Sequence, residues 1–138
     1  MSLRVADEPD PDVVAWAVRE LHAHNAAVTG IGDARALFAA VRDDDGALVA
    51  ALDGWTWGGT AYVDTLWVRP DARGAGLGTG LLAAAEAEAR DRGCAQIVLT
   101  THSFQAPDLY RRCGFEVAGE VDGYPAGHAY YLMRKRLR

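Results

Sequence analysis

Residues 67–82 read WVRPDARGAGLGTGLL, and the rest of the chain is best understood outward from this stretch. A strand-like apolar run enters it and a helix-like apolar run leaves it. Between the two runs stand Arg73 and glycines at every second position from Gly74 to Gly80. Glycines at this density let the backbone approach a ligand closely, and a helix start attracts anions through its free N–H groups and its dipole. The stretch therefore predicts a phosphate-binding loop.

Two familiar phosphate-binding motifs are excluded by the residues present. The motif GxxxxGK[ST] requires a lysine, and the stretch contains none. The dinucleotide motif GxGxxG fails in both registers, because Thr79 or Leu81 stands where its last glycine is required. The pattern that remains is Arg-x-x-Gly-x-Gly, formed by Arg73, Gly76 and Gly78.

A second motif follows further along the chain, where residues 106–115 read APDLYRRCGF. Taken with LWVRPDARGAGLGTGLL at residues 66–82, it resembles the GNAT superfamily of N-acetyltransferases, which bind acetyl-coenzyme A. The resemblance implies one N-acetyltransferase domain over residues 1–138. It also implies an α/β fold of the GNAT type, with a mixed central sheet of about six or seven strands flanked by about four helices.

The resemblance further implies how acetyl-coenzyme A binds, as a co-substrate and without a metal. The pantetheine arm is expected to pair with the backbone of a splayed strand, which here maps to Leu66, Trp67 and Val68. The pyrophosphate is expected on a segment called here the glycine loop, through its arginine and its backbone amides. The residues of the glycine loop are Arg73, Gly74, Ala75, Gly76, Leu77, Gly78 and Thr79. Ser103 is expected either to bond the pantetheine arm or to cap the next helix.

Tyr110 occupies the position at which many members of this family carry a tyrosine close to the reacting sulfur. The resemblance implies that its hydroxyl protonates the leaving thiolate, a role typically worth about 10²–10⁴ in rate. The alternative is a packed helix aromatic whose hydroxyl lies at the surface. Direct transfer to the amine is expected, because neither Cys94 nor Cys113 has an adjacent base in the sequence for a covalent route.

The amine must lose a proton, and Asp64 is the first candidate for the base. It lies on a predicted central strand, two residues before the segment expected to meet the cofactor, and burial there would make it a stronger base. The alternative for Asp64 is a structural carboxylate bonded to neighbouring backbone or to Tyr62. His102, at the end of a later strand, is a second candidate, and a chain of water molecules is a third.

The acceptor is expected to be a primary amine on a small molecule or a peptide, and no motif identifies it further. Six aromatic residues either line its pocket or pack on the strands: Trp55, Trp57, Trp67, Tyr124, Tyr130 and Tyr131. The rival interpretation is a GNAT-like module that binds or senses acyl-coenzyme A without catalysis. Tyr110 favours the enzyme, since a sensor needs no proton donor at that position.

The composition is that of a globular protein without a site for nucleic acid or membrane. The chain has 138 residues, of which 24% are charged, and a formal net charge of -5. That balance gives no basic footprint for nucleic acid, and no apolar run approaches the ~18 residues of a membrane span. No signal peptide is recognised, so a cytoplasmic protein is expected. The two cysteines are expected to be buried free thiols, and a homodimer is an expectation from the family.

Hydrophobic periodicity and breaker residues predict the remaining elements. Asp10 is expected to cap a helix over residues 11–24, and a loop with a second short helix is expected over residues 26–36. The predicted strands are residues 3–6, 37–42, 47–55, 62–69, 96–101, 115–121 and 128–136, and the other predicted helices are residues 78–92 and 107–114. The strand over residues 62–69 is expected to be central and covered on both faces. A break in the regular structure is expected at Asp53–Gly54, ahead of this central strand.

Overall fold

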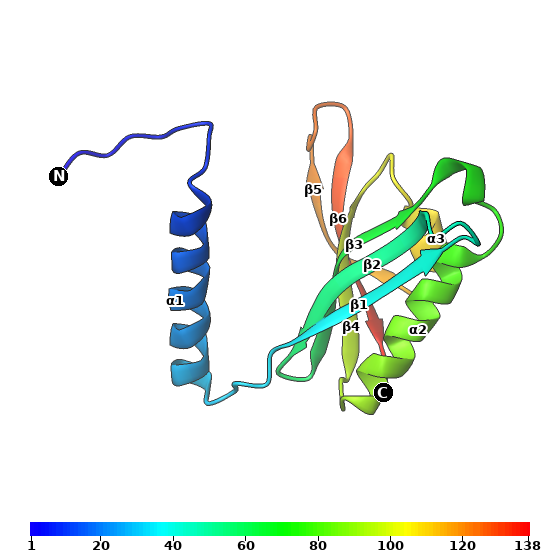
Figure 1. The fold of residues 1–138 in the computed structure, drawn as a ribbon, viewed down its shortest axis with the longest axis horizontal. Helices are drawn as coiled ribbons and strands as arrows, with labels where there is room; N and C mark the ends of the chain where they lie inside the picture. Colours follow the sequence, from blue (N-terminus) through cyan, green and yellow to red (C-terminus); the bar gives the residue numbers. More distant parts are fainter. The chain divides into compact units, whose positions relative to one another are not determined.

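The computed structural model describes residues 1–138 and consists of two compact units, Met1–Gly32 and Asp33–Arg138, which are described in turn. The first unit contains one helix, and the second contains the sheet, two helices and a 3-10 turn (Figure 1). No helix in either unit combines the length and the apolar character that crossing a membrane requires.

The first unit is built on α1 (Pro11–Thr29). Its start confirms the predicted cap, because the Asp10 carboxylate accepts a hydrogen bond from the backbone N–H of Asp12 at 3.0 Å. The helix runs past its predicted end at His24, because the alanines that follow favour helix. It ends at Gly30, whose φ of 71° lies in the left-handed region that glycine adopts without strain.

Two predictions for the first part of the chain are wrong. Residues 3–6 form no strand, since a strand needs a hydrogen-bonded neighbour and every strand of the sheet lies within residues 35–136. Residues 26–36 hold no second helix, because α1 takes their first part and the first strand begins at Arg35. The chain therefore has three α-helices and a 3-10 turn, where about four helices were expected.

The second unit is organised around one mixed sheet of six strands, which confirms the predicted α/β architecture. The strands are β1 (Arg35–Arg42), β2 (Leu48–Trp57), β3 (Thr60–Val68), β4 (Gln96–His102), β5 (Glu116–Asp122) and β6 (Ala129–Arg136). Their order across the sheet is β1-β2-β3-β4-β6-β5. Only β3 and β4 run parallel, as expected for two strands joined through a helix, and the other neighbours are antiparallel.

The β2–β3 hairpin explains the Asp53–Gly54 pair, which was expected to interrupt the chain. β2 continues through both residues, and the pairing register shifts between them. Gly54 lies so close to β3 that a Cβ atom there would stand 2.0 Å from the carbonyl oxygen of Tyr62. A β-bulge with a closely approaching glycine therefore replaces the predicted break.

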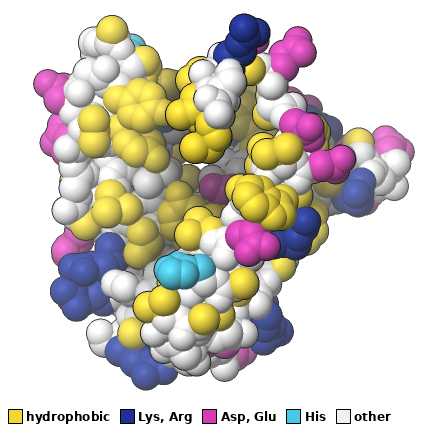
Figure 2. Space-filling view, turned by 90° about the vertical axis from the view of Figure 1, so that its left-hand side faces the viewer, with side chains coloured by type: hydrophobic (Ala, Val, Ile, Leu, Met, Phe, Trp, Pro, Cys, Tyr) yellow, Lys and Arg dark blue, Asp and Glu magenta, His cyan; other side chains and the backbone are white.

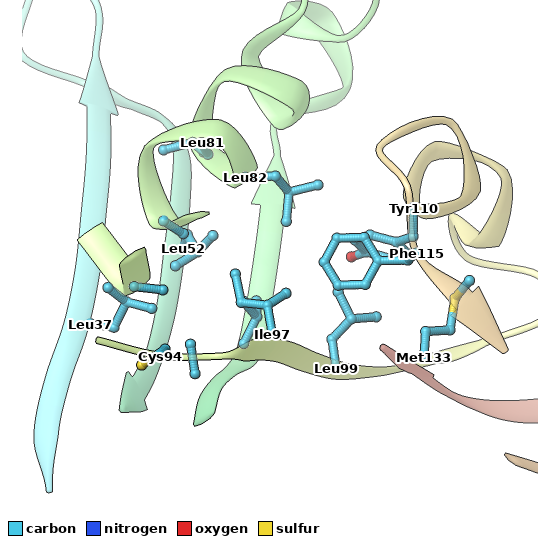
Figure 3. Packing of buried hydrophobic residues seen from close by; sticks show 14 of the residues in the cluster. Leu37, Leu52, Leu81, Leu82, Cys94, Ile97, Leu99, Tyr110, Phe115 and Met133 are labelled. Atoms are coloured by element: carbon cyan, nitrogen blue, oxygen red, sulfur yellow. The ribbon is translucent and has the colours of Figure 1, made fainter. Parts of the chain in front are cut away.

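Helical elements occur in two connections of the second unit, between β3 and β4 and between β4 and β5. The elements are η1 (Pro70–Ala72), α2 (Leu77–Asp91) and α3 (Pro107–Arg112). α2 connects β3 to β4 and buries an apolar stripe at helical spacing, which consists of Leu81, Leu82, Ala85 and Ala89. Figure 3 shows how Leu81 and Leu82 face residues of the sheet such as Leu52, Ile97 and Leu99, each of which is almost completely buried. This contact between α2 and the sheet forms the main core.

The charged side and the end of α2 follow from local sequence. The i,i+4 pairs Glu86–Arg90 and Glu88–Arg92 both form, each with a nitrogen to oxygen distance of 3.0 Å. Gly93 follows the helix with φ of 80°, as expected for a glycine that ends a helix. The chain is thus returned to the sheet at the start of β4.

Candidate active site

The site begins where two neighbouring strands part. β3 pairs with β4 only from Thr60 to Val63, opposite Gln96 to Leu99. From Thr65 to Val68, β3 is paired with β2 but has no partner on its β4 side, and Asp64 is the extra residue of the β-bulge, without a partner on either strand. Backbone N–H and C=O groups on that edge are therefore left for a ligand or for water. This divergence is the splay that the family resemblance implied.

A cleft of about 1040 Å³ lies at this splay. Its walls come from the open half of β3, the glycine loop with the start of α2, the end of β4, and α3 with the turn before it. Of the predicted cofactor residues, Leu66, Trp67, Val68 and Arg73 all line it. So do Gly74, Gly76, Leu77, Gly78 and Thr79, whereas Ala75 does not. The two motifs, residues 66–82 and residues 106–115, are separate in the sequence, and both contribute residues to this one cleft.

Arg73 is fixed in the cleft by two contacts of its own segment. Its Nε donates a hydrogen bond to the carbonyl oxygen of Val68 at 2.9 Å. Its guanidinium carbon lies 4.7 Å from the centre of the Trp67 ring, which is a cation–π distance. The two terminal nitrogens take part in no hydrogen bond within the protein, so the outward edge of the guanidinium is available to an anion.

The backbone of the glycine loop has the form that a phosphate group needs. Gly74 and Gly76 have φ of 83° and 82°, a region that residues with a Cβ atom rarely enter. Gly76 caps α2 without any side-chain hydrogen bond, so the first N–H groups of this 15-residue helix have no side-chain acceptor. At Gly78 a Cβ atom would meet the side chain of Leu109 at 3.4 Å. The residues present therefore fit a pyrophosphate group at the loop.

Tyr110 lies on the opposite wall of the cleft, on α3. Its residue is 7% exposed, and its ring packs edge-on against Phe115 with centroids 5.9 Å apart (Figure 3). The Tyr110 hydroxyl makes no hydrogen bond within the protein. Every fully buried side-chain oxygen of the protein has a hydrogen-bond partner, so the Tyr110 oxygen is not fully buried. Because Tyr110 lines the cleft, we infer that its oxygen is exposed there. Burial raises the pKa of the Tyr110 hydroxyl above 10, and Cys113 adds a smaller effect in the same direction. The group is therefore a protonated phenol at neutral pH.

Asp64 lines the cleft but is exposed, and the predicted burial of this carboxylate is wrong. The prediction assumed a strand covered on both faces along its whole length. Pairing with β4 ends at Val63, and Asp64 is the extra residue of the β-bulge with β2, so its side chain is open to solvent while Leu66 and Val68 beyond it still pack against the core. Asp64 therefore lines the cleft as an exposed carboxylate and not as the buried acid that the sequence suggested.

The structure does not bring His102 or Ser103 to the cleft lining. His102 Nδ1 lies 3.0 Å from the carbonyl oxygen of Tyr124, and its ring stacks on Phe104 at 5.3 Å. Ser103 Oγ accepts a hydrogen bond from the N–H of Ala129 at 3.0 Å. The predicted helix cap is wrong, because α3 starts after Ala106 without a side-chain cap.

The aromatic residues fall into different environments. Trp67 is the one of the predicted six that lines the cleft. Trp55 stacks on Tyr62 with centroids 4.7 Å apart, and Tyr130 packs against Tyr124 at 5.0 Å. Hydrophobic side chains are also visible among charged side chains of both signs on the face drawn in Figure 2. Most of the six are therefore strand-face residues rather than walls of the cleft.

Sequence reasoning gave no role to several residues that line the cleft. The main ones are Phe104, Gln105, Leu109 and Arg112. Leu109 and Arg112 are spaced by three on α3, which would have placed them on one face had the helix been aligned with the glycine loop beforehand. Cys94 is a buried free thiol as predicted, while Cys113 is half-buried. No group of three or more His, Cys, Asp or Glu side chains is arranged to hold a metal ion.

A mixed sheet that opens between two parallel strands, beside a glycine-rich helix start, defines the class of protein. The chain belongs to the acetyltransferase (GNAT) family, an enzyme family whose sequence profile matches residues 4–115. It is similar to blasticidin-S acetyltransferase of Streptomyces morookaense, with 45% identity over 84 residues, which is 60% of each chain. Acetyltransferase Atu2258 of Agrobacterium fabrum is 37% identical over 137 residues, which is 99% of this chain and 100% of that protein.

A solved structure supports the same family at full length. A crystal structure from Agrobacterium tumefaciens superimposes with a TM-score of 0.90 and 34% identity, covering 99% of both chains. The match to the blasticidin-S enzyme, by contrast, spans less than two thirds of that relative. Fold and family are therefore shared over the whole chain.

Proposed function

We propose that this protein transfers an acetyl group from acetyl-coenzyme A directly to a primary amine, with Tyr110 as the general acid. One observation carries the proposal: the Tyr110 hydroxyl enters a cleft whose other wall is the glycine loop. Its ring is buried, and its oxygen is engaged by no protein group. A proton donor in that position has a reason to exist only if a bond breaks nearby.

The two ends of the ligand correspond to two parts of the cleft. Leu66, Trp67 and Val68 offer the unpaired backbone edge of β3 to the pantetheine arm. Arg73 offers its terminal nitrogens to the pyrophosphate, together with the free amides at the start of α2. The arm would then run along the splay, with the thioester directed toward Tyr110.

The reaction needs one proton donor and one proton acceptor. Acetyl-coenzyme A supplies the acetyl group as a thioester. The amine nitrogen bonds to the carbonyl carbon, and the C–S bond breaks with its electron pair going to sulfur. Tyr110 donates its proton to that sulfur, and the nitrogen gives up a proton to a base. Asp64 is proposed as that base, acting through water because its carboxylate is exposed.

The acceptor is proposed to be a small-molecule or peptide amine. A relative named for blasticidin S makes that compound a rational first acceptor to test. A polyamine and an N-terminal peptide amine extend the panel to other amine classes. Release of free thiol in the presence of one of these amines, and not in its absence, would support acetyl transfer to it.

The decisive variant is Tyr110→Phe, which removes one hydroxyl and keeps the ring. Acetyl-coenzyme A should raise the melting temperature of the variant and of the wild type equally. The corresponding stabilisation of the folded state is about 2.7 kcal/mol at a ligand concentration of 100 times the dissociation constant. Turnover should fall by about 10²–10⁴. NAD and ATP serve as control ligands and should cause no shift. Unchanged turnover would remove Tyr110 from the mechanism.

The rival function, a binding or sensing module, predicts a different pattern. Acetyl-coenzyme A would shift the melting temperature, but no amine in the panel would release thiol from the wild type. A second check concerns the covalent route through a cysteine. Activity should survive in Cys113→Ser, and an acetylated form of the wild-type protein that accumulates without amine would contradict direct transfer.

A further inference from the structure

A second guanidinium group lines the cleft, and nothing in the proposed chemistry uses it. Arg112, the last residue of α3, lines the cleft, is exposed, and forms no hydrogen bond or ion pair within the protein. Arg73 and Arg112 are the only cationic side chains among the lining residues, and Asp64 is the only acidic one. Arg112 is thus a charge without a partner in a site expected to receive anions.

The position of Arg112 follows from contacts between α3 and the glycine loop. Leu109 lies against Gly78, since a Cβ atom on that glycine would stand 3.4 Å from the Leu109 side chain. Arg112 follows Leu109 by three residues, so both side chains project from the same face of α3. Arg112 therefore belongs to the α3 wall of the cleft, whereas Arg73 belongs to the wall formed by the glycine loop.

The neighbouring arginine provides an internal contrast. Arg111 forms an ion pair with Asp108, with a distance of 3.1 Å, and its guanidinium carbon lies 5.9 Å from the Tyr131 ring centre. It is absent from the cleft lining. Two successive arginines on one helix therefore differ in function: one is tied to protein groups, and the other is presented to the cleft.

Acetyl-coenzyme A carries two separate phosphate groups, a pyrophosphate and a phosphate on the 3′ carbon of the ribose. We propose that Arg112 binds the 3′-phosphate, an inference that rests on the proposed function. Arg73, held by Val68 and Trp67 at the head of the glycine loop, serves the pyrophosphate. An arginine on the opposite wall then remains for the second phosphate, which it contacts through charge-assisted hydrogen bonds.

The experiment is a cycle that removes the arginine and the phosphate in turn. Calorimetric titration measures the affinity of acetyl-coenzyme A and of its 3′-dephospho form for the wild type and for Arg112→Gln. The wild type should prefer the phosphorylated ligand by about five- to tenfold. Arg112→Gln should lose this preference, because acetyl-coenzyme A binds more weakly while the dephospho form binds as before. Arg111→Gln is the matched control and should keep the wild-type preference.

Each other outcome has a defined meaning. A preference that persists in Arg112→Gln overturns the inference, and so does an equal loss of affinity for both ligands, which would assign Arg112 to the pyrophosphate. Absence of binding by the wild type to either ligand would overturn the proposed function as well. Melting of both variants without ligand should match the wild type, because both side chains are exposed.

Discussion

The two halves of β3 belong to one strand but differ in their pairing and in their burial. From Thr60 to Val63 the strand is paired on both edges, and Ala61 and Val63 are buried. From Thr65 to Val68 it is paired with β2 alone, Asp64 between the two halves is the unpaired residue of the bulge, and Asp64, Thr65 and Trp67 are exposed. The first half therefore serves the core, while the second serves the cleft.

This difference shows that pairing, not residue type, decides which part of the strand is functional. Val68 is as apolar as Val63, but Val63 is 3% exposed whereas Val68 is only half-buried. What separates them is the presence of β4 on the second edge. Changes in the paired half should therefore act on stability, and changes in the open half should act on ligand binding.

The largest effect is expected at Gly54, opposite the paired half. Gly54→Ala should lower the free energy of unfolding by at least about 3 kcal/mol, because the new Cβ meets the backbone of Tyr62 at 2.0 Å. Denaturant unfolding followed by circular dichroism measures it. Gly80→Ala is the control, since nothing lies within 4 Å of a Cβ there; that helix substitution should stabilise by up to about 1 kcal/mol. Equal stability of the two variants would contradict the close approach.

A direct comparison of the two halves comes from one residue on each side of the bulge at Asp64. Val63→Ala should cost about 2 kcal/mol in the free energy of unfolding, because a side chain that is 3% exposed is cut back. Thr65→Ala should cost less than about 0.5 kcal/mol, because Thr65 is exposed. Urea unfolding of both variants gives the two values. A large loss in Thr65→Ala would mean that the open half is covered in solution.

Arg73 tests the ligand side of the comparison. Arg73→Gln should weaken acetyl-coenzyme A by roughly tenfold, about 1.5 kcal/mol, because its charged hydrogen bonds to phosphate are lost. The melting temperature without ligand should stay the same. Arg69→Gln is the control, because Arg69 pairs with Asp71 and Asp43 rather than lining the cleft. Titration calorimetry distinguishes the two, and equal affinities would remove Arg73 from the binding site.

The smallest effect is expected from the ionisation of Tyr110, which lines the cleft where the two halves of β3 meet. Burial raises the pKa of this phenol in the folded protein above its value of 10.0 in the unfolded chain. The stabilisation is therefore complete below about pH 10 and is lost as the pH rises through the folded pKa. Between pH 9 and pH 11 the wild type should lose more stability than Tyr110→Phe. Parallel losses would contradict the burial of the hydroxyl.

Much of the fold follows from local patterns in the sequence. Asp10 before Pro11 fixes the start of α1, and the apolar stripe that includes Leu81 and Ala85 fixes the buried side of α2. These features depend on residues within one or two turns of each other, so a pattern of spacing suffices to find them. The glycine loop was predictable for the same reason.

The cleft was only partly predictable, because it depends on where pairing stops. A β-bulge at Asp64 shifts the side-chain alternation of β3 by one residue, and the residue types on either side of it do not indicate where the bulge falls, so the exposure of Asp64 could not be predicted. His102 appeared free to act as a base, but its partner Tyr124 comes from a distant turn. Arg112 lies within the second motif, but the motif assigns it no role, and only the contact of Leu109 with Gly78 relates it to the glycine loop.

The strand order has a consequence for synthesis on the ribosome. β4 pairs with β3 over four residues but with β6 over seven, and β6 lies between β4 and β5 in the sheet. A nascent chain that has reached α3 already contains the glycine loop and Tyr110, yet the strand beside them lacks its longer partner. All residues that line the cleft are therefore synthesised before the last hairpin, which completes the sheet beside β4 without contributing to the cleft lining.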